Sequence, residues 1–168
     1  NNDWRSITKT RYTHDATNYL FVRVDSPHTF EPLDEKLSVD GYDAIVISDY
    51  DKGFLSEEQI ERICSSHDLV FLDTKKPLGP WANKAKFIKI NDFEYKRSIP
   101  NLTPVLEERI IHTMGAAGAQ MGGKVFPVEA AEIKDSSGAG DAFMAALVHK
   151  FLQSHDIAES IIFANECA

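Results

Sequence analysis

The chain is poor in cysteine and contains no long apolar run. Its 168 residues include two cysteines, Cys64 and Cys167, whose spacing matches neither a CxxC pair nor a zinc site. We therefore expect two buried thiols and a reducing, cytoplasmic setting. The longest uninterrupted apolar run, residues 142–148, is far shorter than the ~18 residues that indicate a membrane span. The first residues also lack the basic and apolar regions of a secretory signal, so we expect no membrane partner.

Basic residues are in the minority. The sequence has 18 lysines and arginines against 26 aspartates and glutamates, which gives a formal net charge of −8. Because nucleic acids attract positively charged surfaces, this balance argues against a nucleic-acid partner. A hydrophobic content of 43% over 168 residues is typical of a single globular domain with its own core.

Short apolar segments separated by helix signals indicate an α/β fold. Four segments have the apolar character of strands: residues 43–48, 69–73, 87–90 and 109–113. Between the first two, Ser56 and Gln59 form the capping-box pattern that begins a helix. Because strand, helix and strand in this order form a right-handed crossover, we expect a mainly parallel sheet between layers of helices.

Turn signals predict two hairpins and a helical end to the chain. A polar stretch separates two strand-like segments near the N-terminus, and Gly122-Gly123 separates two more. The predicted hairpins and helices cover residues 6–25, 119–128 and 141–154, followed by a helix that Asp156 opens.

The segment most informative about chemistry is Asp135-Ser-Ser-Gly-Ala-Gly-Asp141. Gly138 and Gly140 permit a tight turn and the close approach of a ligand. A helix that begins near Asp141 directs free N–H groups and its positive dipole end toward this loop, which favours an anion or a transferring phosphoryl group. Asp141 would be stabilised there as a carboxylate and suits the role of a base. A generic Gly-x-Gly-Asp segment is more often a turn with an acidic cap, so the surrounding motifs decide.

Two further motifs follow predicted strand ends. Thr113, Gly115 and Gly118 come at the end of a strand, where ligands lie in open parallel sheets. Asn91 and Glu94 are spaced to share one side of a first helical turn, from which they can hold magnesium-bound waters. The alternative for Asn91 and Glu94 is an ordinary helix N-terminus.

Together, and in this order, these segments resemble the signatures of the ribokinase-like carbohydrate kinases. Asp135–Asp141 is similar to the family's Asp-Thr-x-Gly-Ala-Gly-Asp motif, Asn91–Glu94 to its Asn-x-x-Glu motif, and Thr113-Met-Gly115 to its nucleotide-side strand end. Asn165 lies in a segment that resembles the helix carrying an asparagine near the adenine. The resemblance implies a three-layer α/β/α ribokinase-like sandwich with a mainly parallel sheet and a β-hairpin lid.

The resemblance also implies a function, namely ATP-dependent phosphorylation of a sugar or sugar-phosphate hydroxyl with the help of Mg²⁺. In this interpretation Asp141 is the catalytic base, and the amides of Gly138, Ala139 and Gly140 form an anion hole. The implied nucleotide-side residues are Thr113, Gly115, Gly118, Asn165 and Lys75. The implied metal-side residues, which act through water or phosphate, are Asn91, Glu94 and Asp135.

Within the family, the sequence looks most like kinases that act on heptose phosphates. The resemblance is carried by residues 47–53, which read Ile-Ser-Asp-Tyr-Asp-Lys-Gly, and by residues 8–11 followed by residues 21–25. Those kinases also have an Asp-Pro-Lys element, where residues 73–75 here read Asp-Thr-Lys. Lys9, Arg11 and Lys52 are then expected on the substrate side, because their charges suit a phosphate group. For each of them, and for Lys75, solvated surface charge is the alternative.

The resemblance begins late in the family pattern. Nothing here matches the N-terminal sugar-binding segment with its Gly-Gly-Asn element, and the chain stops at Ala168, before the family's closing segment. We therefore expect residues 1–168 to be the C-terminal portion of one kinase domain. Its lid hairpin, over residues 6–25, is expected to pair with a second copy or with N-terminal strands. A non-catalytic nucleotide-binding module, or an assembly protein of the same fold, stays an alternative.

Overall fold

The structure, a computed structural model, describes residues 8–17, 19–26, 30, 32–33, 37–128 and 138–168. The strands are β1 (Lys9–Thr13), β2 (Leu20–Asp25), β3 (Ile45–Asp49), β4 (Val70–Thr74), β5 (Phe87–Asn91), β6 (Ile110–Thr113), β7 (Ala119–Met121) and β8 (Lys124–Phe126). The α-helices are α1 (Glu57–Ser66), α2 (Asp92–Ser98), α3 (Pro104–Glu107), α4 (Ala139–Ser154) and α5 (Ile157–Cys167). Short 3₁₀ helices cover Pro80–Ala82, Ile99–Asn101 and Gly115–Ala117.

The main sheet is mostly parallel, as the sequence predicts. Its order is β3-β4-β5-β6-β7-β8; β3 to β6 pair in parallel, and β7 and β8 form an antiparallel end. The predicted strands differ from the observed ones by a residue or two at their ends. Because β3 to β6 run in one direction, their carboxyl ends open at a single edge of the sheet.

Helix α1 forms where its capping signal predicts. Ser56 accepts a hydrogen bond from Gln59 N at 3.2 Å, and the Gln59 side chain accepts one from Ser56 N at 2.7 Å. This reciprocal pair satisfies two amide groups that have no helical partner. Ile60, Ile63 and Cys64 are the buried face of the helix, which holds α1 against β3 and β4.

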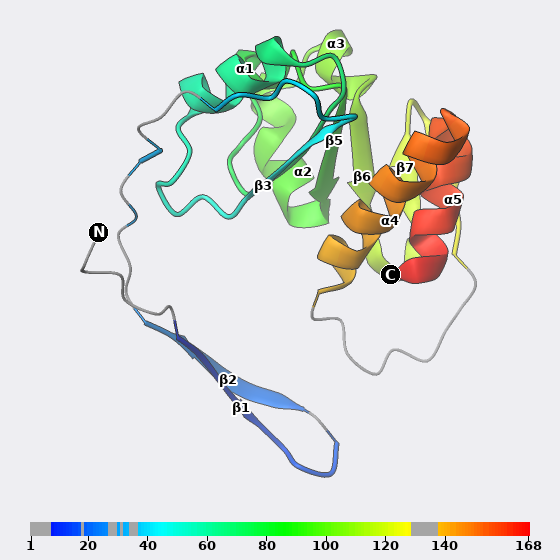
Figure 1. Cartoon of the computed structure of the whole chain (residues 1–168). Helices are drawn as coiled ribbons and strands as arrows, with labels where there is room; N and C mark the ends of the chain where they lie inside the picture. Colours follow the sequence, from blue (N-terminus) through cyan, green and yellow to red (C-terminus); the bar gives the residue numbers. More distant parts are fainter. Residues whose placement is uncertain (1–7, 18, 27–29, 31, 34–36, 129–137) are drawn as a thin grey trace.

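Helices cover both faces of the sheet and give three layers (Figure 1). On one face, α1 packs on apolar side chains of β3, β4 and β5. On the other, α4 and α5 pack on a cluster that includes Phe71, Phe87 and Ile111. Side chains alternate between faces along each strand, so residues two positions after Phe71 and Phe87 also point toward the α4 side.

The predicted lid hairpin is present as β1 and β2, which pair antiparallel and project from the rest of the chain (Figure 1). Residues 6 and 7 of the expected hairpin lie outside the described residues. One face of the ribbon carries large apolar side chains that are exposed in this chain: Tyr12, Leu20, Val22 and Val24.

The two cysteines differ in environment. Cys64 is buried, and this burial raises the pKa of its thiol to about 11. Cys167 is exposed, so the expectation of two buried thiols is wrong for this residue. The reason is its place at the end of α5, beyond the buried positions Ser160, Ile161 and Ala164. In the described part of the chain, no helix is long and apolar enough to cross a membrane.

Candidate active site

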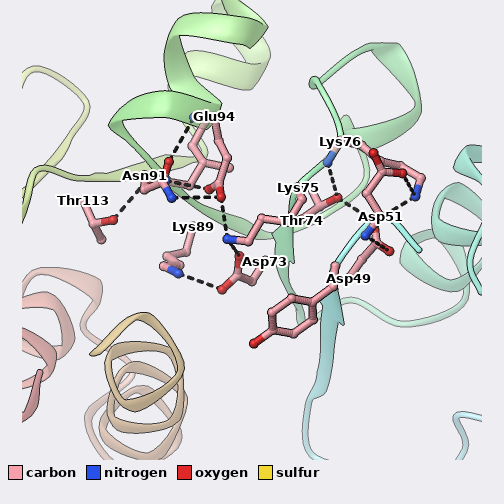
Figure 2. Close-up of polar contacts among 12 residues, drawn as sticks. Asp49, Asp51, Asp73, Thr74, Lys75, Lys76, Lys89, Asn91, Glu94 and Thr113 are labelled. Carbon is pink, nitrogen blue, oxygen red and sulfur yellow. Dashed lines mark hydrogen bonds and ion pairs between the residues drawn. The ribbon is translucent and has the colours of Figure 1, made fainter. Parts of the chain in front are cut away.

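Polar side chains gather at the carboxyl ends of β3, β4 and β5 (Figure 2). Asp49 is the last residue of β3, Thr74 is the last of β4, and Asn91 is the last of β5. The first turn of α4 reaches the same edge, because Asp141 contacts Tyr50, the residue after β3. Ligands of open parallel sheets bind at this edge, which makes it the candidate site.

Helix α4 begins with amide groups that precede its hydrogen-bond ladder. Gly138 is the N-cap in the left-handed region, with φ +87°, and Ala142 N donates to Gly138 O at 2.8 Å as the first helical bond. The N–H groups of Ala139, Gly140 and Asp141 therefore have no helical acceptor. Together with the helix dipole they favour a negatively charged group in front of the helix.

The helix begins at Ala139, two residues before the predicted first residue, Asp141. Because Gly138 is the N-cap, Asp141 lies in the first turn of the helix and not at the cap. Asp135, which opens the motif, lies with residues 129–137 outside the described residues.

Asp141 is exposed, and its carboxylate is held by a tyrosine that the sequence analysis did not single out. The Tyr50 hydroxyl donates to Asp141 Oδ1 and Oδ2, each at 3.0 Å. Burial, the bond to Asp141 and the charges of Asp141 and Asp73 raise the pKa of the Tyr50 phenol. The phenol is therefore a neutral donor at neutral pH. Because a carboxylate offers about four acceptor positions, Asp141 retains capacity for a second donor.

A buried lysine lies directly beside the start of α4. Lys89 is 3% exposed, and its Nζ donates to Asp73 Oδ2 at 2.7 Å. A Cβ atom on Gly140 would lie 2.7 Å from Lys89 Nζ, so the missing side chain at position 140 leaves room for the ammonium group. Pairing with Asp73 offsets the cost of burying this charge.

Lys89 is a residue that the sequence analysis missed. It lies in Phe87-Ile-Lys-Ile90, where the apolar neighbours indicate a strand, so that the single lysine was not considered as a site residue. The signal that could have revealed it is a lone lysine in a strand otherwise expected to be buried, since such a charge requires a partner.

The Asn91 and Glu94 motif is a capping box at the start of α2. Asn91 Oδ1 accepts from Glu94 N at 3.0 Å, and Glu94 Oε2 accepts from Asn91 N at 2.8 Å. Glu94 Oε1 also pairs with Lys75 Nζ, which lies 3.8 Å from Asp73 Oδ1. Burial opposes the charged form of Lys75, but the hydrogen bond to Glu94 and the nearby carboxylates prevail and raise the pKa of Lys75. The alternative of an ordinary helix N-terminus thus describes the local geometry of this motif correctly.

The oxygen-rich edge suits a hard cation held through water. Asp73 Oδ1 is buried and accepts no hydrogen bond from the residues that the structure describes. It lies near Glu94, since both pair with Lys75, and carboxylate and amide oxygens are ligands that Mg²⁺ accepts with several retained waters. Within the described ranges, no group of three or more His, Cys, Asp or Glu side chains is placed to bind a metal directly. The buried Asp73 oxygen and the neighbouring Glu94 carboxylate are oxygen donors of the kind that a hydrated Mg²⁺ ion accepts, and the role of Asn91 and Glu94 toward the ion stays a prediction.

The described contacts do not join the residues expected on the nucleotide side into a single cluster. Thr113 is paired in register with Asn91 and donates to Ile90 O at 3.4 Å, so it belongs to the polar edge. Gly118 and Asn165 meet at the carbonyl of Phe126, to which Asn165 Nδ2 donates at 2.9 Å. Gly115 is exposed with φ +58°, and no atom lies within 4 Å of its would-be Cβ. Lys75 lies apart from the Phe126 group, beside Glu94 and Tyr50.

Of the residues expected on the substrate side, only Lys9 has a described contact with the side chains at the carboxyl ends of the strands, namely with Tyr50. Lys9 Nζ lies 5.4 Å from the centroid of the Tyr50 ring, and Lys75 Nζ lies 6.0 Å from it. Arg11 lies opposite Arg23 on the exposed hairpin. Lys52 is exposed and makes no ion pair with the described residues.

Comparison with known proteins matches the sequence to one family. The model of the pfkB family carbohydrate kinases matches residues 36–168. Proteins named bifunctional protein HldE are similar in sequence: that of a Nitratiruptor species is 30% identical over 91% of the chain, and that of Helicobacter pylori (strain Shi470) is 28% identical over 91%. The chain spans 39% and 40% of the length of these two relatives.

Solved structures show the same fold. A nucleoside kinase from Burkholderia thailandensis, in complex with inosine, superposes with a TM-score of 0.69 at 18% identity, over 96% of this chain and 60% of that one. A pyrophosphate-dependent kinase in the ribokinase family, in complex with sulfate, gives 0.62 at 17% identity, over 96% of this chain and 67% of that one. The expected ribokinase-like α/β/α fold is thereby confirmed.

Proposed function

Because the chain belongs to the pfkB family of carbohydrate kinases, we propose that it transfers the γ-phosphoryl group of ATP to a hydroxyl of a sugar or sugar phosphate. The observation that carries the proposal is the first turn of α4, which presents the Asp141 carboxylate beside the free amides of Ala139 and Gly140. A base for a hydroxyl and an adjacent anion site are the two elements that phosphoryl transfer to an alcohol requires.

In the proposed reaction, the acceptor hydroxyl gives its proton to a carboxylate oxygen of Asp141 while its oxygen forms a bond to the γ-phosphorus. The bond from that phosphorus to the β,γ-bridging oxygen breaks, and ADP leaves with the electron pair. The anion hole of Gly138, Ala139 and Gly140 stabilises the charge on the transferring group. Lys89, which is paired with Asp73, places its ammonium group beside Gly140 in this region.

The nucleotide is proposed to bind along the strand ends from β4 to β8. Asn91, Glu94 and Asp135 would hold Mg²⁺ through water, and the ion when bound neutralises charge on the phosphates. Lys75 lies beside Glu94 and supplies a further cation for the phosphates. The other residues assigned to nucleotide binding are Thr113, Gly115, Gly118 and Asn165.

The proposed acceptor is a heptose phosphate. The resemblance of residues 8–11, 21–25 and 47–53 to heptose-phosphate kinases supports this choice. Lys9, Arg11 and Lys52 are proposed to meet the acceptor phosphate, and the contact of Lys9 with the ring of Tyr50 supports the assignment for Lys9.

The proposed setting follows from the same interpretation. The protein would act in the cytoplasm, and residues 1–168 would form part of one kinase domain. The exposed apolar face of the β1–β2 hairpin supports pairing with a second copy or with further strands, since an isolated two-stranded ribbon is marginally stable in water.

A coupled assay on the complete protein tests the function. ADP release is measured with ATP, Mg²⁺ and a panel of sugars and sugar phosphates, and the proposal expects release that depends on one class of acceptor. The melting temperature is measured in parallel with and without nucleotide. A nucleotide-dependent rise in the melting temperature without turnover would support the non-catalytic binding module. The absence of both the rise and the turnover would support an assembly role.

The main effect of Gly140→Val is expected to be on kcat and not on the melting temperature. Its side chain would enter the space of the Lys89 ammonium and crowd the anion site. We expect kcat to fall by about 10²-fold, the size of effect that the loss of one donor has in such a site, because the new side chain would displace the loop amides from the transferring group. Ala145→Val, at an exposed position of the same helix, is the matched control. A loss confined to the melting temperature would assign Gly140 a purely structural role.

A further inference from the structure

The contact of Tyr50 with Asp141 supports an inference about how the proposed reaction works, and this inference rests on the proposed function. Tyr50 reaches the Asp141 carboxylate from a distant part of the sequence, with both carboxylate oxygens at 3.0 Å from its hydroxyl. We infer that Tyr50 is a positioning residue, which orients the Asp141 carboxylate for the acceptor hydroxyl.

The backbone that carries Tyr50 is clamped on both sides. Lys76 Nζ pairs with Asp49 Oδ2 at 3.0 Å and with Asp51 Oδ1 at 2.8 Å, so one buried ammonium group holds the residues before and after Tyr50. Thr74 Oγ1 also donates to Asp49 Oδ2, at 2.7 Å.

The turn itself adds to this rigidity. Asp51 has φ +53°, in the left-handed region, and its N–H donates to Asp49 Oδ1 at 3.0 Å. Residues hold such a conformation where their surroundings over-determine it. The Tyr50 side chain therefore extends from a fixed turn, and its hydroxyl is a fixed point for Asp141.

The hydrogen bond fits a positioning role on chemical grounds. A protonated phenol has a single proton to donate to the Asp141 carboxylate, and it leaves the remaining lone pairs of that carboxylate for a second donor. Reaction rates depend steeply on the placement of reacting groups, and a displacement of about 1 Å can cost on the order of 10²-fold. Two ammonium groups, on Lys9 and Lys75, lie near the Tyr50 ring and are retained when only the hydroxyl is removed.

The test is Tyr50→Phe in the complete protein, with acceptor-dependent ADP release as the assay. We expect kcat to fall about 10-fold, a size that suits the loss of one hydrogen bond to a charged group, with the KM for ATP changed less than about twofold. Tyr42→Phe is the matched control, because Tyr42 is 64% exposed and its hydroxyl has no described partner. It is expected to match the wild type.

A double-mutant cycle separates positioning from general structure. In the Asp141→Ala background, Tyr50→Phe is expected to have no further effect on the residual rate, since its partner is gone. A Tyr50→Phe variant with wild-type kcat would overturn the role of Tyr50, as would an undiminished effect in the Asp141→Ala background. If the wild type phosphorylates no acceptor, the proposed function is wrong, and the role of Tyr50 in it is wrong as well.

Discussion

Asp141→Asn is expected to lower kcat by about 10²–10⁴-fold, the range that removal of a general base produces. Asparagine keeps the size of the side chain and an oxygen for the Tyr50 hydroxyl, but it does not accept the proton of the acceptor hydroxyl. The binding of ATP should persist, because the nucleotide side is assigned to other elements. Steady-state kinetics with the complete protein, together with nucleotide titrations, measure both quantities.

The fold should tolerate this change. Asp141 is exposed in the first turn of α4, and the loss of a favourable charge at a helix N-terminus costs about 0.3–1 kcal/mol. Asp68→Asn, at another exposed position, is the control for the removal of one carboxylate. Turnover by Asp141→Asn at a rate close to that of the wild type would show that another group accepts the proton.

Gly118→Ala is expected to cause a large fall in the free energy of unfolding. Gly118 has φ +84°, and a Cβ there would lie 2.1 Å from Phe126 O. Backbone strain in the left-handed region costs on the order of 1–3 kcal/mol, and the clash adds to it because a backbone atom must move. We expect a loss of at least about 3 kcal/mol, which corresponds to roughly 6–12 °C in the melting temperature for a domain of this size.

Gly123→Ala is the control that isolates the clash. Gly123 has φ +77°, but no atom lies within 4 Å of its would-be Cβ, so this variant carries the strain alone. Thermal denaturation of both variants measures the difference. Equal melting temperatures would show that β7 and β8 adjust freely, and that Gly118 is not required for the approach to Phe126.

Local signals in the sequence predicted much of the fold. The capping box of Ser56 and Gln59 depends on residues three apart, so its pattern could be read directly and the structure confirms it. The apolar segments likewise located the parallel strands, because each buried strand has its own composition. The start of α4 was placed late, since a glycine cap gives no side-chain signal.

The candidate site was harder to predict because its contacts join distant segments. Asn91 and Glu94 could be paired from their spacing, but Tyr50 and Asp141 are 91 positions apart and meet only through the fold. Lys89 was missed for a related reason. Its burial is supported by Asp73 on a neighbouring strand, which strand composition alone does not reveal.

Phosphorus NMR on the complete protein tests the central proposal most directly. The protein is incubated with ATP, Mg²⁺ and heptose phosphates or other sugars, and the fate of the γ-phosphoryl group is followed. The proposal predicts a new phosphate-ester resonance on one acceptor class, formed together with ADP, and its formation at least about 10²-fold more slowly in Asp141→Asn. It is contradicted if no acceptor gains a phosphoryl group while ATP is bound, or if Asp141→Asn forms the product at the wild-type rate.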